Sequence, residues 1–177
     1  EVREIVYTVP DGSMRALVVV VAGSGEGQIA AGSSFSCTVY WKTGVYSQPL
    51  ERLYGTGSSG GEGNGSIFYL RRPAVGTGVI KISWEFYETG LTWKGVPDVL
   101  AVAIMAFTEV DQSTHYYTAD RCVDQDGADA DYQCDLIDSF SPGDYAVCLV
   151  MTPQADDITF TPAAGVTEVL DARVPSA

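Results

Sequence analysis

Residues 34–41 read SFSCTVYW, and an apolar residue occupies every second position of this stretch. The apolar series from Phe35 to Trp41 shares one face of an extended chain, because successive side chains of a β-strand point to opposite sides. Ser36, Thr38 and Tyr40 share the other face. The stretch therefore predicts a strand with one buried side.

Similar short runs, rich in β-branched and aromatic residues, lie on both sides of this stretch. Clusters of Gly, Pro, Asn, Asp and Ser separate the runs, and no segment has the i, i+3, i+4 spacing of an amphipathic helix. The sequence predicts ten strands, at Arg3–Thr8, Arg15–Ala22, Ser34–Trp41, Ser66–Arg71, Gly78–Phe86, Val99–Thr108, Asp135–Phe140, Asp144–Thr152, Ile158–Thr161 and Thr167–Arg173.

Two of the predicted strands, with the cores LVVVV (17–21) and VLAVAIMAF (99–107), are apolar on both faces and should be central or covered by another layer. About ten strands without crossover helices favour an all-β, antiparallel β-sandwich of jelly-roll-like type, because each sheet must bury its apolar face against the other. The length of 177 residues suits one sizeable core. We expect a single domain over residues 1–177.

The charge balance excludes some partners. Ten Lys and Arg stand against 23 Asp and Glu, and a net charge of -13 repels a phosphate backbone, so nucleic acid is not an expected partner. The longest apolar runs are well short of the roughly 20 residues that a membrane-spanning helix needs. The sequence therefore predicts no membrane insertion. It opens at Glu1 without an initiating Met, which favours a processed chain.

Four cysteines, at positions 37, 122, 134 and 148, show no CxxC spacing, and one His is too few to complete a zinc site with them. An even cysteine number in an acidic, Lys-poor chain favours disulfides and an extracellular setting, with buried free thiols as the alternative. We expect Cys122 to pair with Cys134 and Cys37 with Cys148, although four cysteines allow three connectivities.

Seven aspartates lie between Asp120 and Asp138, with a single Arg among them. So many carboxylates repel one another unless a cation or open solvent intervenes, and hard oxygen ligands suit calcium. The pattern around Gly127 resembles a calcium loop in composition, although the glycine and the last ligand are not at EF-hand positions. A solvated acidic loop is the favoured interpretation, and a calcium loop is the alternative. The candidate ligands are Asp124, Asp126, Asp129 and Asp131.

Catalytic patterns are incomplete. His115 is the only imidazole, and no GxSxG elbow is present for a hydrolase triad. Glu109 and Asp111 fit the first two positions of the ExDxxE pattern of sandwich glycosidases, but Thr114 occupies the third. The glycine-rich stretches 23–27 and 55–65 lack the helix that a nucleotide phosphate needs. The sequence therefore predicts neither an enzyme nor an organic cofactor.

Four stretches carry a resemblance: TVYWKTGVYSQPLERLYG (38–55), SIFYLRRPAVGTGVIKISW (66–84), VLAVAIMAFTEVDQST (99–114) and SPGDYAVCLVM (141–151). In order, they resemble a β-sandwich domain that recurs in bacteriophage structural proteins and bacterial surface proteins. These motifs form turns and strands and do not make up a catalytic pattern. The resemblance implies the fold, and a location on a virion surface or outside the cell.

The expected function is a non-enzymatic structural or interaction protein. We expect a virion component, such as a decoration, capsid-associated or tail-associated protein, or a surface-filament subunit, whose partners are copies of itself or other such subunits. A carbohydrate-binding or adhesion module using Trp93 is the alternative, and a glycoside hydrolase is the third. Residues 1–10 and 167–177 are strand-like and terminal, so each either completes its own sheet or contacts a neighbouring subunit. We expect at least one to contact a neighbour.

Overall fold

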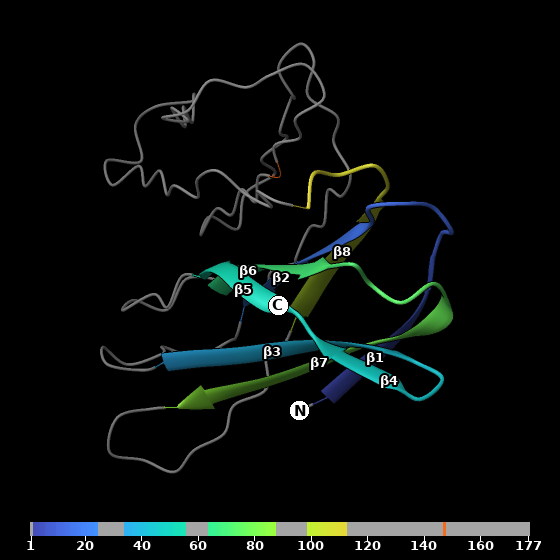
Figure 1. Ribbon diagram of the computed structural model, residues 1–177. Helices are drawn as coiled ribbons and strands as arrows, with labels where there is room; N and C mark the ends of the chain where they lie inside the picture. The colour runs from blue at the N-terminus through green and yellow to red at the C-terminus, as the bar shows by residue number, and fades with distance from the viewer. Residues whose placement is uncertain (1, 25–33, 56–63, 88–98, 113–146, 148–177) are drawn as a thin grey trace, which may run out of the picture.

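The computed structural model describes residues 2–24, 34–55, 64–87, 99–112 and 147 (Figure 1). Within these ranges, the structure contains strands and no helix. The described residues therefore include no helix that is long and apolar enough to cross a membrane. The strands are β1 (Val2–Val9), β2 (Ala16–Ser24), β3 (Ser34–Thr43), β4 (Tyr46–Pro49), β5 (Glu51–Gly55), β6 (Asn64–Arg71), β7 (Gly76–Tyr87) and β8 (Val99–Phe107).

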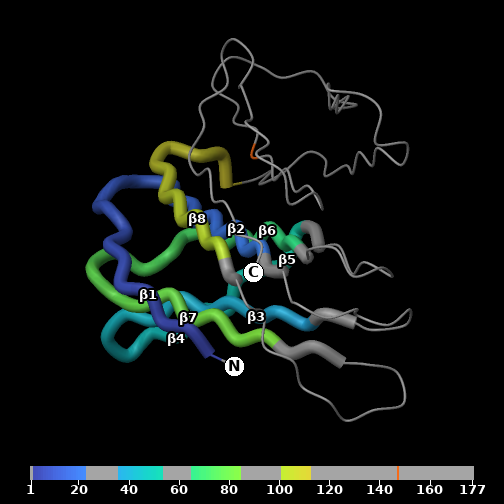
Figure 2. Tube along the Cα trace, turned by 180° about the vertical axis from the view of Figure 1, so that it is seen from behind, coloured from blue at the N-terminus to red at the C-terminus, as the bar shows by residue number. Residues whose placement is uncertain are grey.

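The eight strands form two antiparallel sheets of four strands each, which lie as two layers in Figures 1 and 2. The first sheet has the order β1-β7-β3-β4, and the second has the order β5-β6-β2-β8. The chain changes sheet between β1 and β2 and again between β2 and β3, so sequence neighbours do not pair there. The predicted all-β class and two-sheet arrangement are confirmed for the described residues.

The first six predicted strands are confirmed as β1, β2, β3, β6, β7 and β8, with ends that differ by at most two residues. Strands β4 and β5 were not predicted, because they are short and their sequences YSQP and ERLYG lack a run of alternating apolar residues. The four predicted strands between residues 135 and 173 lie outside the described residues, apart from Val147.

The main core lies between the sheets and consists of the inward-facing positions. In the first sheet, Trp41 pairs with Ile80 and Val39 with Ile82, and all four are essentially inaccessible to solvent. Phe68 from the second sheet is 1% exposed and faces them. The predicted alternation along β3 is therefore confirmed. The buried members of this cluster are Val9, Leu17, Val19, Val21, Cys37, Val39, Trp41, Leu50, Phe68, Ile80, Ile82 and Trp84.

Strand β2 is buried on both faces, as its continuous apolar run predicts. Leu17, Val19 and Val21 face the main core, whereas Val18 and Val20 belong to a second cluster on the outer side of the second sheet. Partly buried side chains pack against this second cluster, and they are Leu53, Ile67, Ala103, Met105, Phe107, Val110 and Val147. The outer side of the second sheet is therefore a packed layer rather than a solvated face.

The connection from β6 to β7 crosses between the sheets and is fixed by side chains from the first sheet. The indole Nε1 of Trp41 donates a hydrogen bond to the Ala74 carbonyl at 2.9 Å. The Ala74 amide donates to Oε1 of Gln48 at 2.8 Å. Gly76, with φ of +111°, then begins β7 in a conformation that favours glycine. The buried indole of Trp41 therefore also fixes the β6–β7 connection at one end of the sandwich.

Strand β1 completes its own sheet, which is one of the two alternatives that the sequence allowed. It pairs with β7 along its whole length, from Val2 opposite Ser83 to Val9 opposite Gly76. Val9 is 1% exposed, and Ile5 packs against the main core. The terminal strand is therefore an integral part of the sandwich and also one edge of the first sheet.

Candidate functional site

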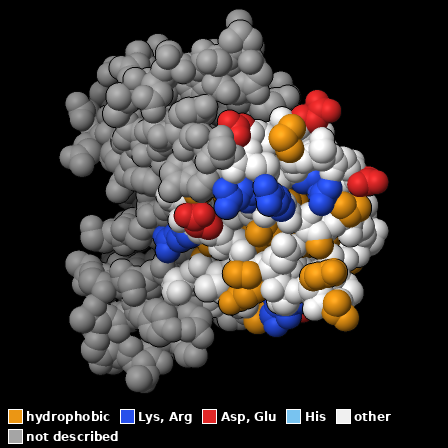
Figure 3. All heavy atoms as spheres, in the orientation of Figure 1, with side chains coloured by type: hydrophobic (Ala, Val, Ile, Leu, Met, Phe, Trp, Pro, Cys, Tyr) orange, Lys and Arg blue, Asp and Glu red, His pale blue; other side chains and the backbone are white. Residues whose placement is uncertain are grey.

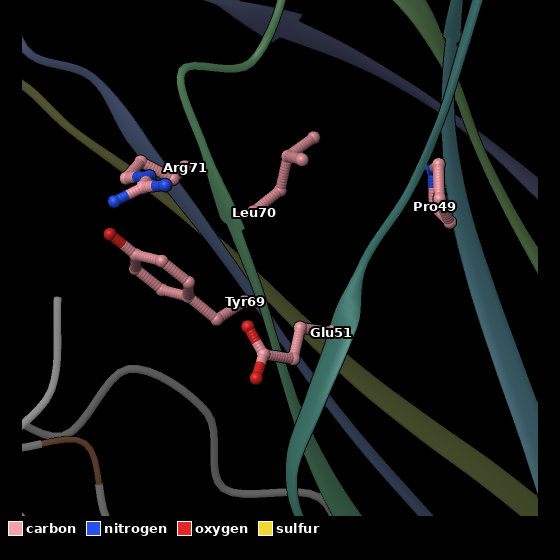
Figure 4. A pocket seen from close by; sticks show the side chains of 5 residues that line it. All are labelled: Pro49, Glu51, Tyr69, Leu70 and Arg71. Atoms are coloured by element: carbon pink, nitrogen blue, oxygen red, sulfur yellow. The ribbon is translucent and has the colours of Figure 1, made fainter. Parts of the chain in front are cut away.

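A groove of about 250 Å3 lies at the edge of the second sheet, where β5 pairs with β6 (Figure 4). Its described lining residues are Pro49, Glu51, Tyr69, Leu70 and Arg71. The chain leaves β4 at Pro49 and begins β5 at Glu51, so this short passage between the sheets forms one side of the groove. Strand β6 forms the other side.

Strand geometry places the three polar side chains of the groove on one face. Glu51 lies directly opposite Tyr69 across the β5–β6 pair. Arg71 is two residues beyond Tyr69 on β6, so both point away from the main core, whereas Leu70 between them packs against it. In Figure 4 the Tyr69 hydroxyl points toward the Arg71 guanidinium, and the Glu51 carboxylate lies nearer the base of the ring.

Burial controls the ionisation of Tyr69. The residue is only 5% exposed, and burial raises the pKa of its hydroxyl above the usual value of 10.0. The positive charge of Arg71 lowers this pKa and the negative charge of Glu51 raises it, both to a smaller extent. The hydroxyl therefore keeps its proton at neutral pH and is a hydrogen-bond donor as well as an acceptor.

The Arg71 side chain is held by the segment that follows β8. Its Nη1 donates to the Gln112 carbonyl at 2.8 Å. The Gln112 side chain in turn donates from Nε2 to the carbonyl of Val110 at 2.9 Å and to that of Arg15 at 3.3 Å. Among the described residues, one nitrogen of the guanidinium is thus used for positioning, and the group carries further N–H donors.

The arrangement suits the binding of a small polar or anionic group. Arg71 and Tyr69 offer N–H and O–H donors, Glu51 offers an acceptor, and the lining by Pro49 and Leu70 is apolar. The described lining residues include no His, Cys or Ser that could act as a nucleophile. The described lining can bind a small polar group, with a preference for a carboxylate on the side of Arg71.

Sequence analysis did not find this groove. Glu51 lies on a strand that was not predicted, and Tyr69 lies on a predicted strand whose outward face was not assigned a partner. The signal that could have indicated it is the pair Arg71-Arg72 before Pro73, which places two adjacent charges at the end of an apolar strand. A charge at the end of a strand whose outer face is otherwise buried points to a surface opening.

The candidate calcium ligands, Asp124, Asp126, Asp129 and Asp131, lie outside the described residues. Within the described ranges, no group of three or more His, Cys, Asp or Glu side chains could hold a metal ion. The calcium loop therefore stays an alternative interpretation of the sequence.

Cys37 is buried in the main core and forms no disulfide within the described residues. Its predicted partner Cys148 lies outside the described residues, as do Cys122 and Cys134, so both disulfides stay predictions. Burial raises the pKa of the Cys37 thiol to about 12, and the nearby positive charge of Arg52 opposes this rise. A thiol in this environment is protonated and unreactive at neutral pH.

This pKa predicts how stability changes at alkaline pH when the thiol is free. The neutral thiol is favoured in the folded state, so its contribution is complete below the usual pKa of 9.0 and is lost as pH rises toward 12. We expect the free energy of unfolding, measured in urea, to fall more steeply between pH 8.5 and 10.5 for the wild type than for Cys37→Ala. Parallel curves would contradict this prediction.

The residues considered for catalysis do not form a site in the described part of the chain. Glu109 and Asp111 follow the end of β8 at exposed positions, and Glu109 adopts a positive φ of 61°. The same-face geometry of a strand therefore does not apply to this pair. His115 and Thr114 lie outside the described residues.

Trp41 and Trp84 are buried, as their positions on apolar strand faces predict. Trp41 is 0% exposed and Trp84 is 3% exposed, so both belong to the main core and neither offers a face on which a sugar could stack. Trp93, the residue named for a carbohydrate site, lies outside the described residues. The two described tryptophans therefore add no support to a carbohydrate-binding role.

Comparison with known proteins shows no matching family model, no matching curated protein and no matching solved structure. The resemblance to a domain of phage and bacterial surface proteins accordingly stays a prediction. A proposal for function therefore has to rest on the residues of the groove and of the sheet edges.

Proposed function

We propose that this chain is a non-enzymatic structural subunit that assembles with copies of itself through the edges of its sandwich. The observation that carries the proposal is the exposed edge at β1. Among the described strands, β1 pairs with β7 alone, so one side of its backbone faces away from the sheet. A sheet edge of this kind can accept a strand or a side-by-side contact from a neighbour.

The side chains of β1 support the same role. Val6 is 73% exposed and Val2 is 51% exposed, both on the outer face of the first sheet. Apolar side chains beside an open edge lower their free energy when a neighbour covers them. Ile5 and Val9 point inward and pack in the main core, so they fix the position of β1 at the edge of the sheet.

The more specific role that we propose is a virion component, such as a decoration, capsid-associated or tail-associated protein, or a subunit of a surface filament, outside the cell. Its support is the resemblance of the four sequence stretches. The same domain would have ten strands in a jelly-roll-like arrangement. Support for strands beyond β8 comes from Val147, which belongs to the predicted strand 144–152 and packs against the outer cluster of the second sheet.

A test of the assembly role compares two substitutions of the same kind. Val6→Lys places a charge on the exposed face of β1, whereas Val45→Lys places it in the β3–β4 turn, where Val45 is 94% exposed. In sedimentation velocity runs at increasing concentration, we expect wild type and Val45→Lys to form assemblies and Val6→Lys to remain monomeric. Wild type that stays monomeric throughout, or equal behaviour of the two variants, would contradict the proposal.

A further inference from the structure

The edge strands of the described sandwich differ in how well they are protected from pairing with another chain. Edges are commonly protected by shortness, by proline or by a bulge. β4 has only four residues and ends at Pro49, which has no N–H to donate. β5 has five residues and a register shift between Arg52 and Tyr54. At the fourth edge, the described residues of β8 include no exposed large apolar side chain.

Among the described edges, β1 has none of these protections. Its eight residues pair with β7 without a register shift, and it contains neither Pro nor Lys. Val2 and Val6 are exposed on its outer face. Figure 3 shows hydrophobic side chains at the surface over the lower part of the described region, where Figure 1 places the first sheet. β1 is therefore the least protected of the described edges.

The residues of β1 also avoid the repulsion that a net charge of -13 creates between copies of this chain. Arg3 and Glu4 are the only charged residues of the strand, so the strand as a whole is neutral. Glu4 also lies opposite Lys81 in the pair with β7, which places a positively charged residue of the same sheet beside it. Two copies of β1 can therefore approach each other without a local excess of negative charge.

The two faces of β1 limit how it can pair with β1 of a second copy. Opposite residues of an antiparallel pair point to the same side of the sheet. In β1 the even-numbered residues from Val2 to Thr8 point outward, because Ile5 and Val9 pack in the main core. A two-fold axis perpendicular to the sheet makes outward residues meet outward residues. One residue of β1 must then lie on the axis, opposite its own copy.

The charges and the exposed valine select the residue on the axis. Arg3 or Glu4 at the axis would face a like charge. Ile5 at the axis would place the exposed Val6 opposite Glu4 of the second copy, and Tyr7 at the axis would pair only residues 5–9. Val6 at the axis pairs residues 3–9 and covers the most exposed apolar side chain of the strand with a matching one.

We infer that β1 pairs antiparallel with β1 of a second copy about a two-fold axis at Val6, so that the two four-stranded first sheets join into one continuous sheet. This inference rests on the proposed assembly role and names the partner, the direction and the register of the contact. Both copies use the same surface, so the contact is closed and joins two copies only. A larger assembly needs a second contact elsewhere on the sandwich.

The experiment exchanges charges at the axis and measures association constants by sedimentation equilibrium. In Val6→Lys and in Val6→Glu, each introduced charge faces a like charge, so we expect each variant alone to associate at least about tenfold more weakly than wild type. In an equimolar mixture the introduced charges are opposite, and we expect association within about threefold of wild type. Val6 is 73% exposed, so both variants should keep the melting temperature of the wild type.

The matched controls are Val45→Lys and Val45→Glu, which make the same charge changes in the β3–β4 turn, where Val45 is 94% exposed. We expect both to associate like wild type, alone and mixed. A gain on mixing the Val45 variants would overturn the inference in favour of attraction by net charge.

The remaining outcomes separate the register from the assembly role. If each Val6 variant blocks association and mixing does not restore it, the two-fold register at Val6 is wrong and the assembly role stands. If Val6→Lys associates as well as Val45→Lys, or if the wild type is monomeric, both the inference and the assembly role are wrong.

Discussion

Replacing Gly78 with Ala should lower the free energy of unfolding by about 3 kcal/mol or more, because the two central strands of the first sheet cannot accommodate a side chain there. A Cβ at this position would lie 2.2 Å from the Lys42 carbonyl oxygen, 2.7 Å from Cη2 of Trp41 and 2.9 Å from Cβ of Thr43. The Lys42 carbonyl oxygen and Cβ of Thr43 are fixed to the backbone of β3, so they cannot move without breaking the β3–β7 pairing. The measurement is urea unfolding followed by tryptophan fluorescence.

Gly44 provides the matched control, since it lies in the turn that follows β3. A Cβ at Gly44 would meet nothing within 4 Å, but the residue has φ of +54°. Gly44→Ala should therefore cost only the backbone strain of about 1 kcal/mol. If the two variants lose equal stability, the close approach of β3 and β7 at Gly78 is not the cause.

Deletion of residues 1–10 should give a chain that does not fold cooperatively. This deletion removes β1, and with it Ile5, Tyr7 and Val9, which pack against the main core. At roughly 1.5–3 kcal/mol for each buried side chain, the loss is comparable to the total stability of about 5–15 kcal/mol of an ordinary domain. Circular dichroism melting and size-exclusion chromatography of the truncated chain measure the effect.

A variant with the strand kept but its exposed face altered separates folding from assembly. Val2→Thr with Val6→Thr keeps the inward face and the pairing with β7, so this protein should fold with a near-native melting temperature. A truncated chain that melts cooperatively as a monomer would contradict the structure's placement of β1 in its own core, and it would support a role for residues 1–10 in a neighbour alone.

The sequence was most informative where burial is one-sided or complete. Alternation predicted β3 and β7 and the inward position of Trp41, because period two can satisfy a buried face in only one register. The run at Leu17–Val21 predicted a strand covered on both faces, and the outer cluster around Val18 confirms it.

Features that depend on pairing between distant residues were not predictable. Strand β5 becomes a strand because β6 supplies hydrogen-bond partners, and its own residues, such as Glu51 and Arg52, have no strand pattern. The groove exists only because Glu51 falls opposite Tyr69 in this pairing. The choice of β7, rather than a nearer strand, as partner of β1 likewise depends on tertiary packing.

The pairing of β1 with β7 has a consequence for the order in which the protein forms. Thr8 and Thr77 share a hydrogen bond across this pair and are 69 residues apart in the chain. At about 5–20 residues per second, a ribosome takes several seconds to supply β7 after it has made β1. During this time, the segment Ile5–Tyr7 has no partner strand and is exposed to other nascent chains. Slow, non-local strand pairing of this kind leaves β1 prone to aggregation until β7 has been made, and a chaperone that holds residues 1–10 would be of most use in this interval.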